Sequence, residues 1–194
     1  MTAELSKNAE PPPAGDEGSG SESEQPRTCA DISAEDDRWL SIAGFSQLIP
    51  SLVEATLEEV HLSPEMHAVS VALLSDAEVH ALNKAFRQKD AATNVLSFPS
   101  APNLRSQKNR TGPVFLGDVA LAYETVTGEA SEQEKPVLHH AAHLVVHGVL
   151  HLTGFDHGTV PQAERMEAAE RRILGKFGIP DPYGDGELLP ATSL

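Results

Sequence analysis

The chain is poor in cysteine, in basic residues and in long apolar runs, and each scarcity excludes a class of protein. Its single cysteine, Cys29, excludes an intramolecular disulfide and any zinc site built from several cysteines. No apolar run approaches the roughly 18 to 20 residues that cross a bilayer, so we expect no membrane contact. The first residues lack the basic and apolar regions of a secretion signal, which predicts a cytoplasmic protein.

Acidic residues outnumber basic ones most strongly at the start of the chain. Residues 1–37 carry ten acidic and two basic side chains, a balance of −8 out of −15 for all 194 residues. Because this segment also has few large apolar side chains, it predicts a disordered acidic tail. Residues 38–194 are long enough for one compact domain with its own core.

Apolar periodicity and turn residues in that domain predict both helices and strands. Pro50 fits the first helix only in its first turn, and Ser75 with Glu78 forms a capping box at the start of the second. Because the elements do not alternate strictly, we expect a single compact α/β (α+β) domain with a small mixed sheet packed against a central helix and further helices. The first expected helix runs from about Ser46 or Pro50 to His61, and the others span about 75–86, 136–153 and 161–177. The expected strands span 68–74, 94–98 and 114–122.

Six of the nine histidines lie within one run of nineteen residues, from His139 to His157. Four of them are three or four residues apart, so on a helix they share one side. A lone buried histidine is more often a hydrogen-bonded core residue than a ligand, but a row of imidazoles has few structural explanations. The four are His140, His143, His147 and His151.

The spacing inside the run indicates a metal site. His147 and His151 lie one helical turn apart and can bind one ion together. Gly154 can take the positive φ that would turn the chain and return His157 to the pair. Three nitrogen donors with one free position are typical of catalytic zinc, so we expect one zinc ion per chain. His143 could support a ligand, contact substrate or simply pack.

Basic residues gather between Lys84 and Arg110, where six of them face one acid, Asp90. Such a strip could bind a polyanion locally even though the rest of the chain is acidic, or it could be a solvated loop. Arg87 is the favoured functional residue because it lies where a helix ends before a strand. The other candidates are Lys84 and Lys89 as substrate contacts, and Arg105, Lys108 and Arg110, for which both interpretations stay open.

The histidine spacing also matches the zinc peptidase signature H-E-x-x-H-x-x-G-x-x-H, except at one position. Gly148 stands where those enzymes have the glutamate that acts as general base. Peptide hydrolysis is therefore disfavoured. A metal ion combined with an arginine that stabilises an anionic transition state fits phosphodiester cleavage better.

Three motifs together resemble the YbeY family of zinc-dependent endoribonucleases. They are LNKAFRQKDAATNVLSFP over residues 82–99, LGDVAL over 116–121 and HGVLHLTGFDH over 147–157, and a DPY follows at 181–183. The resemblance implies zinc at His147, His151 and His157, and a catalytic Arg87. It also implies single-stranded RNA as substrate, maturation of the 3′ end of small-subunit (16S) ribosomal RNA, ribosome quality control, and contacts with the ribosome or its proteins.

Two alternatives stay open beside this hypothesis. The chain could be a metal-binding ribosome assembly factor with little catalysis of its own, since the peptidase base is absent. It could also be a metal-dependent hydrolase of another bond, such as a peptide bond. Asp156 could take part in catalysis or only stabilise the turn beside it.

Overall fold

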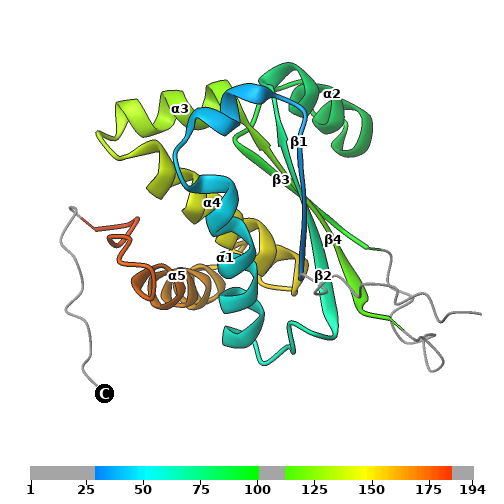
Figure 1. Cartoon of the computed structure of the whole chain (residues 1–194), viewed down its shortest axis with the longest axis vertical. Coiled ribbons are helices and arrows are strands. Elements are labelled where there is room, and N and C mark those ends of the chain that lie inside the picture. The colour runs from blue at the N-terminus through cyan, green and yellow to red at the C-terminus, as the bar shows by residue number, and fades with distance from the viewer. Residues whose placement is uncertain (1–28, 101–111, 185–194) are drawn as a thin grey trace, which may run out of the picture.

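A four-stranded mixed sheet forms the frame of the molecule (Figure 1). The computed structural model describes residues 29–100 and 112–184. Strands β1, β2 and β4 run parallel, and β3 pairs antiparallel with β4 at the edge, in the order β1-β2-β4-β3. Their bounds are Ala30–Ala34 for β1, His67–Leu74 for β2, Val95–Pro99 for β3 and Val114–Ala122 for β4.

Helices cover both faces of this sheet. In Figure 1, α1, α4 and α5 lie on one side of the sheet, and α2 lies on the other side, near the top of the view. Side chains of the strands alternate accordingly: Val71 and Val119 join the core with α1, α4 and α5, while Leu74 and Ala120 pack with α2. The helices are α1 (Phe45–Glu59), α2 (Asp76–Arg87), α3 (Tyr123–Glu132), α4 (Val137–Leu152) and α5 (Val160–Gly175), with a 3-10 turn η1 (Asp37–Ser41) before α1.

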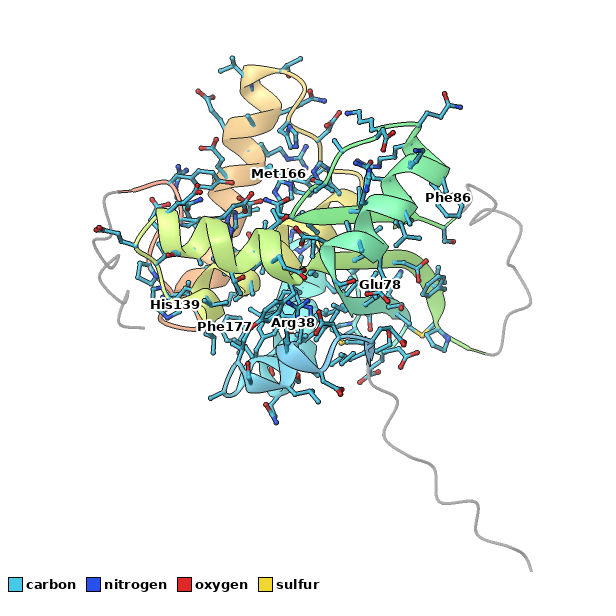
Figure 2. The ribbon with its side chains drawn as sticks, turned by 90° about the horizontal axis from the view of Figure 1, so that it is seen from above. Arg38, Glu78, Phe86, His139, Met166 and Phe177 are labelled. Carbon is cyan, nitrogen blue, oxygen red and sulfur yellow. The ribbon has the colours of Figure 1, made fainter. Side chains whose placement is uncertain are left out.

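Helix α4 is the centre of the core. It contacts β3, β4, α1, α3 and α5, and most of its apolar side chains are fully buried. Figure 2, seen from above, labels Phe86 at the edge of the molecule, at the end of α2, and Met166 on α5. Phe86 is 71% exposed, whereas Met166 is 1% exposed. The predicted central helix and small mixed sheet are confirmed.

The predicted elements recur with shifts of a few residues. The capping box is present, because the Ser75 hydroxyl accepts from the Glu78 backbone N–H while the Glu78 carboxylate accepts from the Ser75 backbone. Pro50 differs from its expected place, since α1 begins at Phe45 and the proline lies in its second turn. Burial of Ile49 and Leu52 on the same helix offsets the hydrogen bond that the proline removes.

The predicted tail boundary at residue 37 is wrong. Residues 30–34 form β1, paired in parallel with β2, and η1 follows with Trp39 fully buried. Ala30, Ile32 and Ala34 contact the core, but the acidic residues between and after them obscure this short alternation. The predicted disorder over residues 1–28 and the candidate residues Arg105, Lys108 and Arg110 lie outside the residues that the structure describes.

Helix α3 was not predicted. It starts directly after β4 with no side-chain cap, and Val126 and Ala130 are its only buried residues, so it has little apolar periodicity. No helix in the two described ranges is long and apolar enough to cross a membrane.

Candidate active site

The last turn of α4 and the loop after it bring three histidines together. Helix α4 ends at Leu152, and Gly154 takes a φ of +95°, as the expected turn requires. The Phe155 N–H donates to the Leu150 carbonyl at 3.1 Å, which closes the turn. The His157 ring then lies 5.0 Å, centroid to centroid, from the ring of His151.

The hydrogen bonds of His147 and His151 determine which nitrogen of each ring is free. The Nδ1 of His147 lies 2.8 Å from Glu170 Oε1, and the Nδ1 of His151 lies 3.0 Å from the Phe155 carbonyl. Because a carboxylate and a carbonyl only accept, both Nδ1 atoms carry protons and donate. In the neutral form of each ring, Nε2 then carries a lone pair, and the two Nε2 atoms lie 3.1 Å apart.

A metal ion fits between these nitrogens. Two nitrogen ligands of tetrahedral zinc, at about 2.0–2.1 Å from the ion, are about 3.3 Å apart. The ligand atoms of His147, His151 and His157 all lie within 4.8 Å of one another. Two facing lone pairs repel each other unless a cation, either a proton or a metal ion, lies between them, so these three histidines could hold a metal ion.

Electrostatics keep His151 neutral and Glu170 ionised. Burial lowers the pKa of His151, and the adjacent His147 lowers it further, against the opposing hydrogen bond to Phe155. Burial alone would raise the pKa of Glu170, but hydrogen bonds from His143, His147 and Tyr183 outweigh it and lower that pKa to about 2. The carboxylate is therefore an acceptor at every physiological pH.

The histidines open into a cleft of about 470 Å³ between α4 and the edge strand β3. Arg87, from the end of α2, lies in the same cleft, and its Nη2 donates to the Ser97 carbonyl of β3 at 2.9 Å. The Ser97 hydroxyl donates in turn to the Gly148 carbonyl of α4 at 3.0 Å. The remaining lining residues are Thr93, Asn94, Val95, Pro99 and Asp156.

Gly148 lies where α4 touches the sheet. A Cβ atom at this position would stand 2.6 Å from Cγ1 of Val119 on β4, a fully buried side chain. A glutamate side chain at residue 148 therefore has no room in this packing. The absent peptidase base is thus part of how the helix fits against the sheet.

The other predicted contacts lie apart from the cleft lining. Lys84 is 63% exposed on its side chain and forms an ion pair with Asp90 at 2.9 Å. Lys89 is exposed in the loop after α2. His143 faces Glu170 and Tyr183, with its Nε2 3.2 Å from Glu170 Oε2. Asp156 does line the cleft, and it also accepts from the His157 backbone at 2.8 Å.

Sequence reasoning missed Glu170, which contacts His147 from α5. The sequence does contain a pattern that indicates it. Glu170 lies four residues after Met166 and three before Ile173, so it is a charged residue on the apolar face of an amphipathic helix. Such a residue is rarely buried without partners.

Comparison with known proteins places the chain in a family. The family model described as Endoribonuclease YbeY matches residues 31–178. A protein named Endoribonuclease YbeY from Rhodopseudomonas palustris is 45% identical over 152 residues, which cover 77% of this chain and 78% of that protein. One of the same name from Azorhizobium caulinodans is 45% identical over 157 residues, covering 79% and 94%.

A solved structure offers a weaker likeness. The solution structure of TM1509 from Thermotoga maritima aligns with a TM-score of 0.47 and 22% identity over 84% of this chain and 99% of that one, a likeness from which no function can be transferred. The family match and the two bacterial relatives are sufficient by themselves: this chain belongs to the YbeY endoribonuclease family.

Proposed function

We propose that this protein is a zinc-dependent endoribonuclease that cleaves single-stranded RNA, with one zinc ion held by His147, His151 and His157. The observation that carries the proposal is the pair of Nε2 lone pairs 3.1 Å apart in a cleft that also contains Arg87. When bound, zinc supplies Lewis-acid stabilisation of the negative charge that develops on oxygen during phosphodiester cleavage.

Arg87 is the proposed catalytic side chain from the protein itself. The Nη2 group of its guanidinium donates to the Ser97 carbonyl, which holds the arginine at the cleft, and its other N–H groups have no hydrogen-bond partner among the residues that the structure describes. A guanidinium matches the paired oxygens of a phosphate, and its charge stabilises the dianionic transition state more than the monoanionic diester. Substrate binding by Lys84, Lys89 and His143 stays a prediction, with weaker support because none of the three lines the cleft.

Family membership supports the biological setting. We propose that the RNA is ribosomal, that the chain acts in maturation of the 3′ end of small-subunit (16S) RNA and in ribosome quality control, and that it works in the cytoplasm in contact with the ribosome or its proteins. The packing of Gly148 against Val119 argues against the alternative of a peptidase. The alternative of an assembly factor with little catalysis differs only in the absence of cleavage.

A cleavage assay tests the proposal. The full chain is stripped of metal, reloaded with zinc, and mixed with matched single-stranded and duplex RNA. We expect cleavage of the single strand only, and only after zinc is restored. Arg87→Ala should keep its zinc and lose about 10²- to 10³-fold in rate, as expected for a group that stabilises transition-state charge.

Arg172→Ala is the matched control, because Arg172 is exposed, pairs with Glu59 at 2.7 Å and does not line the cleft. It should cleave like the parent. Equal rates for Arg87→Ala and the parent would refute the role of that arginine. A zinc-loaded parent that binds RNA without cutting it would favour the assembly factor.

A further inference from the structure

Glu170 is the only fully buried carboxylate in the ranges that the structure describes. It lies on the apolar face of α5, where a charge is costly unless hydrogen bonds compensate it. Three side chains outside α5 compensate it, and one of them, His147, lines the candidate active site.

The three partners of Glu170 are a metal-site ligand, a neighbour of that ligand and a residue from the segment after α5. Oε1 accepts from Nδ1 of His147 at 2.8 Å. Oε2 lies 3.2 Å from Nε2 of His143 and also accepts from the Tyr183 hydroxyl. Burial and this contact raise the pKa of Tyr183, so its hydroxyl keeps the proton that it donates.

The segment that carries Tyr183 is itself attached to the body of the protein. Arg171 Nε donates to Asp181 at 2.9 Å, and Lys135 Nζ donates to the Pro182 carbonyl at 2.8 Å. The Tyr183 ring also packs edge-on against His143, with 5.5 Å between centroids. Tyr183 is therefore held in place on the side of Glu170 away from His147.

We propose that Glu170 is a positioning residue for the metal site, which holds His147 with its Nε2 lone pair directed at the ion, and that Tyr183 and His143 hold Glu170 in turn. This inference rests on the proposed metal site at His147. An acceptor at Nδ1 selects the tautomer that has Nε2 free and makes that nitrogen a stronger donor to the metal. The Phe155 carbonyl selects the tautomer of His151 in the same way, but it is a weaker acceptor than a carboxylate.

A second arrangement of these groups is chemically possible. His143, His147 and Glu170 also lie close enough to bind an ion among themselves. Protons account for the same contacts, since two imidazole N–H groups and one hydroxyl satisfy the two carboxylate oxygens. The two arrangements differ in stoichiometry, with one ion per chain for positioning and two if Glu170 is a ligand.

Zinc affinity without any RNA tests the inference. We would measure zinc content and the dissociation constant by competition with a chromophoric chelator on the folded full chain, with folding checked by circular dichroism. Glu170→Gln keeps the size of the side chain but removes its charge, and should weaken zinc binding about 10- to 100-fold. Tyr183→Phe removes only one support of Glu170, and should weaken it by a smaller factor.

Glu167→Gln is the matched control, because Glu167 is on the same helix, is 34% exposed and pairs with Arg171 rather than with a histidine. It should bind zinc as the parent does. A second readout is the ¹⁵N shift pattern of the His147 ring, which should report a proton on Nδ1 in the parent and a mixture of tautomers in Glu170→Gln.

Unchanged zinc affinity in folded Glu170→Gln would overturn the inference, as would two zinc ions per parent chain. If Glu170→Gln does not fold, an affinity equal to the parent's in Tyr183→Phe would overturn it instead, because the hydroxyl would then have no influence on the site. A parent that binds zinc but does not cleave RNA would refute the proposed function and leave the positioning role intact.

Discussion

The two halves of α4 each carry histidines on the same side of the helix, three residues apart in the first half and four apart in the second, but they leave different ring nitrogens free. In the first half, Nε2 of His140 contacts Glu129 at 2.7 Å and Nε2 of His143 contacts Glu170 at 3.2 Å. In the second half, the partners lie at Nδ1 of His147 and His151, and the Nε2 atoms face each other. The nitrogen farther from the backbone is thus occupied in one half and available in the other.

The difference shows that spacing makes a metal site possible without locating it. All four histidines share one side of the helix, so helix geometry alone gives adjacent pairs similar chances of binding an ion. The choice depends on acceptors from elsewhere: Glu129 from α3, Glu170 from α5 and the carbonyl of Phe155 after the Gly154 turn. Those acceptors assign each ring its role.

The largest expected effect comes from removing the available nitrogens. His147→Ala and His151→Ala should each lose zinc. Four-ligand zinc sites bind with about 10–16 kcal/mol, so one ligand is worth roughly 3 kcal/mol, or about two orders of magnitude in affinity. Zinc content after gel filtration, measured by atomic emission, would show the loss.

His140→Ala is the control from the first half of the helix. It should keep zinc and lose stability instead, because it removes one of the two side chains that contact Glu129, at a position that is 7% exposed. Zinc retained by a variant lacking both His147 and His151, or lost from His140→Ala while the protein stays folded, would contradict the division of α4 into two halves.

The sequence predicted the features that depend on neighbouring residues and missed those that depend on residues far apart in the chain. The helical pair, the Gly154 turn and the capping box at Ser75 depend on residues close together in the chain, and the sequence was sufficient for them. Glu170 follows His147 by 23 residues, and its role depends on how α5 packs against α4. The sequence indicated β1 only weakly, at residues 28–32, and gave no indication of α3. The few buried residues of these two elements become core only through pairing with β2 or packing on α4.

Helices α4 and α3 also differ in how closely a glycine on each approaches its neighbours. Gly148 of α4 tests this difference. A Cβ atom there would meet the buried, β-branched Val119 at 2.6 Å, and such a side chain has little freedom to move aside. Gly148→Ala should therefore lower the free energy of unfolding by about 1–3 kcal/mol. Thermal or urea unfolding of the metal-free protein measures this change.

Gly128→Ala is the control, since an added Cβ on α3 has nothing within 4 Å. It should be neutral or raise the free energy of unfolding by about 0.5–1 kcal/mol, because alanine is the better helix former. If Gly148→Ala were as stable as Gly128→Ala, steric exclusion would no longer explain the missing glutamate.

Nitrogens that are open to a metal are open to protons as well, which predicts a pH effect. Zinc affinity should fall as the pH decreases through the histidine range, by about tenfold per pH unit for each ligand that becomes protonated. The lowered pKa of His151 keeps that ring neutral to a lower pH than an ordinary histidine. Glu170, with a pKa of about 2, stays ionised throughout and adds nothing to the slope.

Chelator competition at a series of pH values between neutral and mildly acidic would measure this dependence. The carboxylate variant Glu167→Gln should follow the same curve as the parent, because Glu167 has no contact with the three ligands. An affinity that is independent of pH over this range would contradict three histidine ligands.

The smallest effect is expected for substitution of Lys84, a basic residue whose side chain is already paired with a carboxylate. Lys84 already pairs with Asp90 at 2.9 Å, and His80 shares that carboxylate at 2.7 Å, whereas Arg87 keeps free donors in the cleft. Lys84→Ala should change RNA affinity by less than about threefold and the salt slope by less than about one ion, the value for a full phosphate contact. Binding titrations at several salt concentrations would measure both. A decrease in RNA affinity well above threefold would mean that RNA displaces Asp90 from Lys84, and the existing ion pair would then not explain a weak role for this lysine.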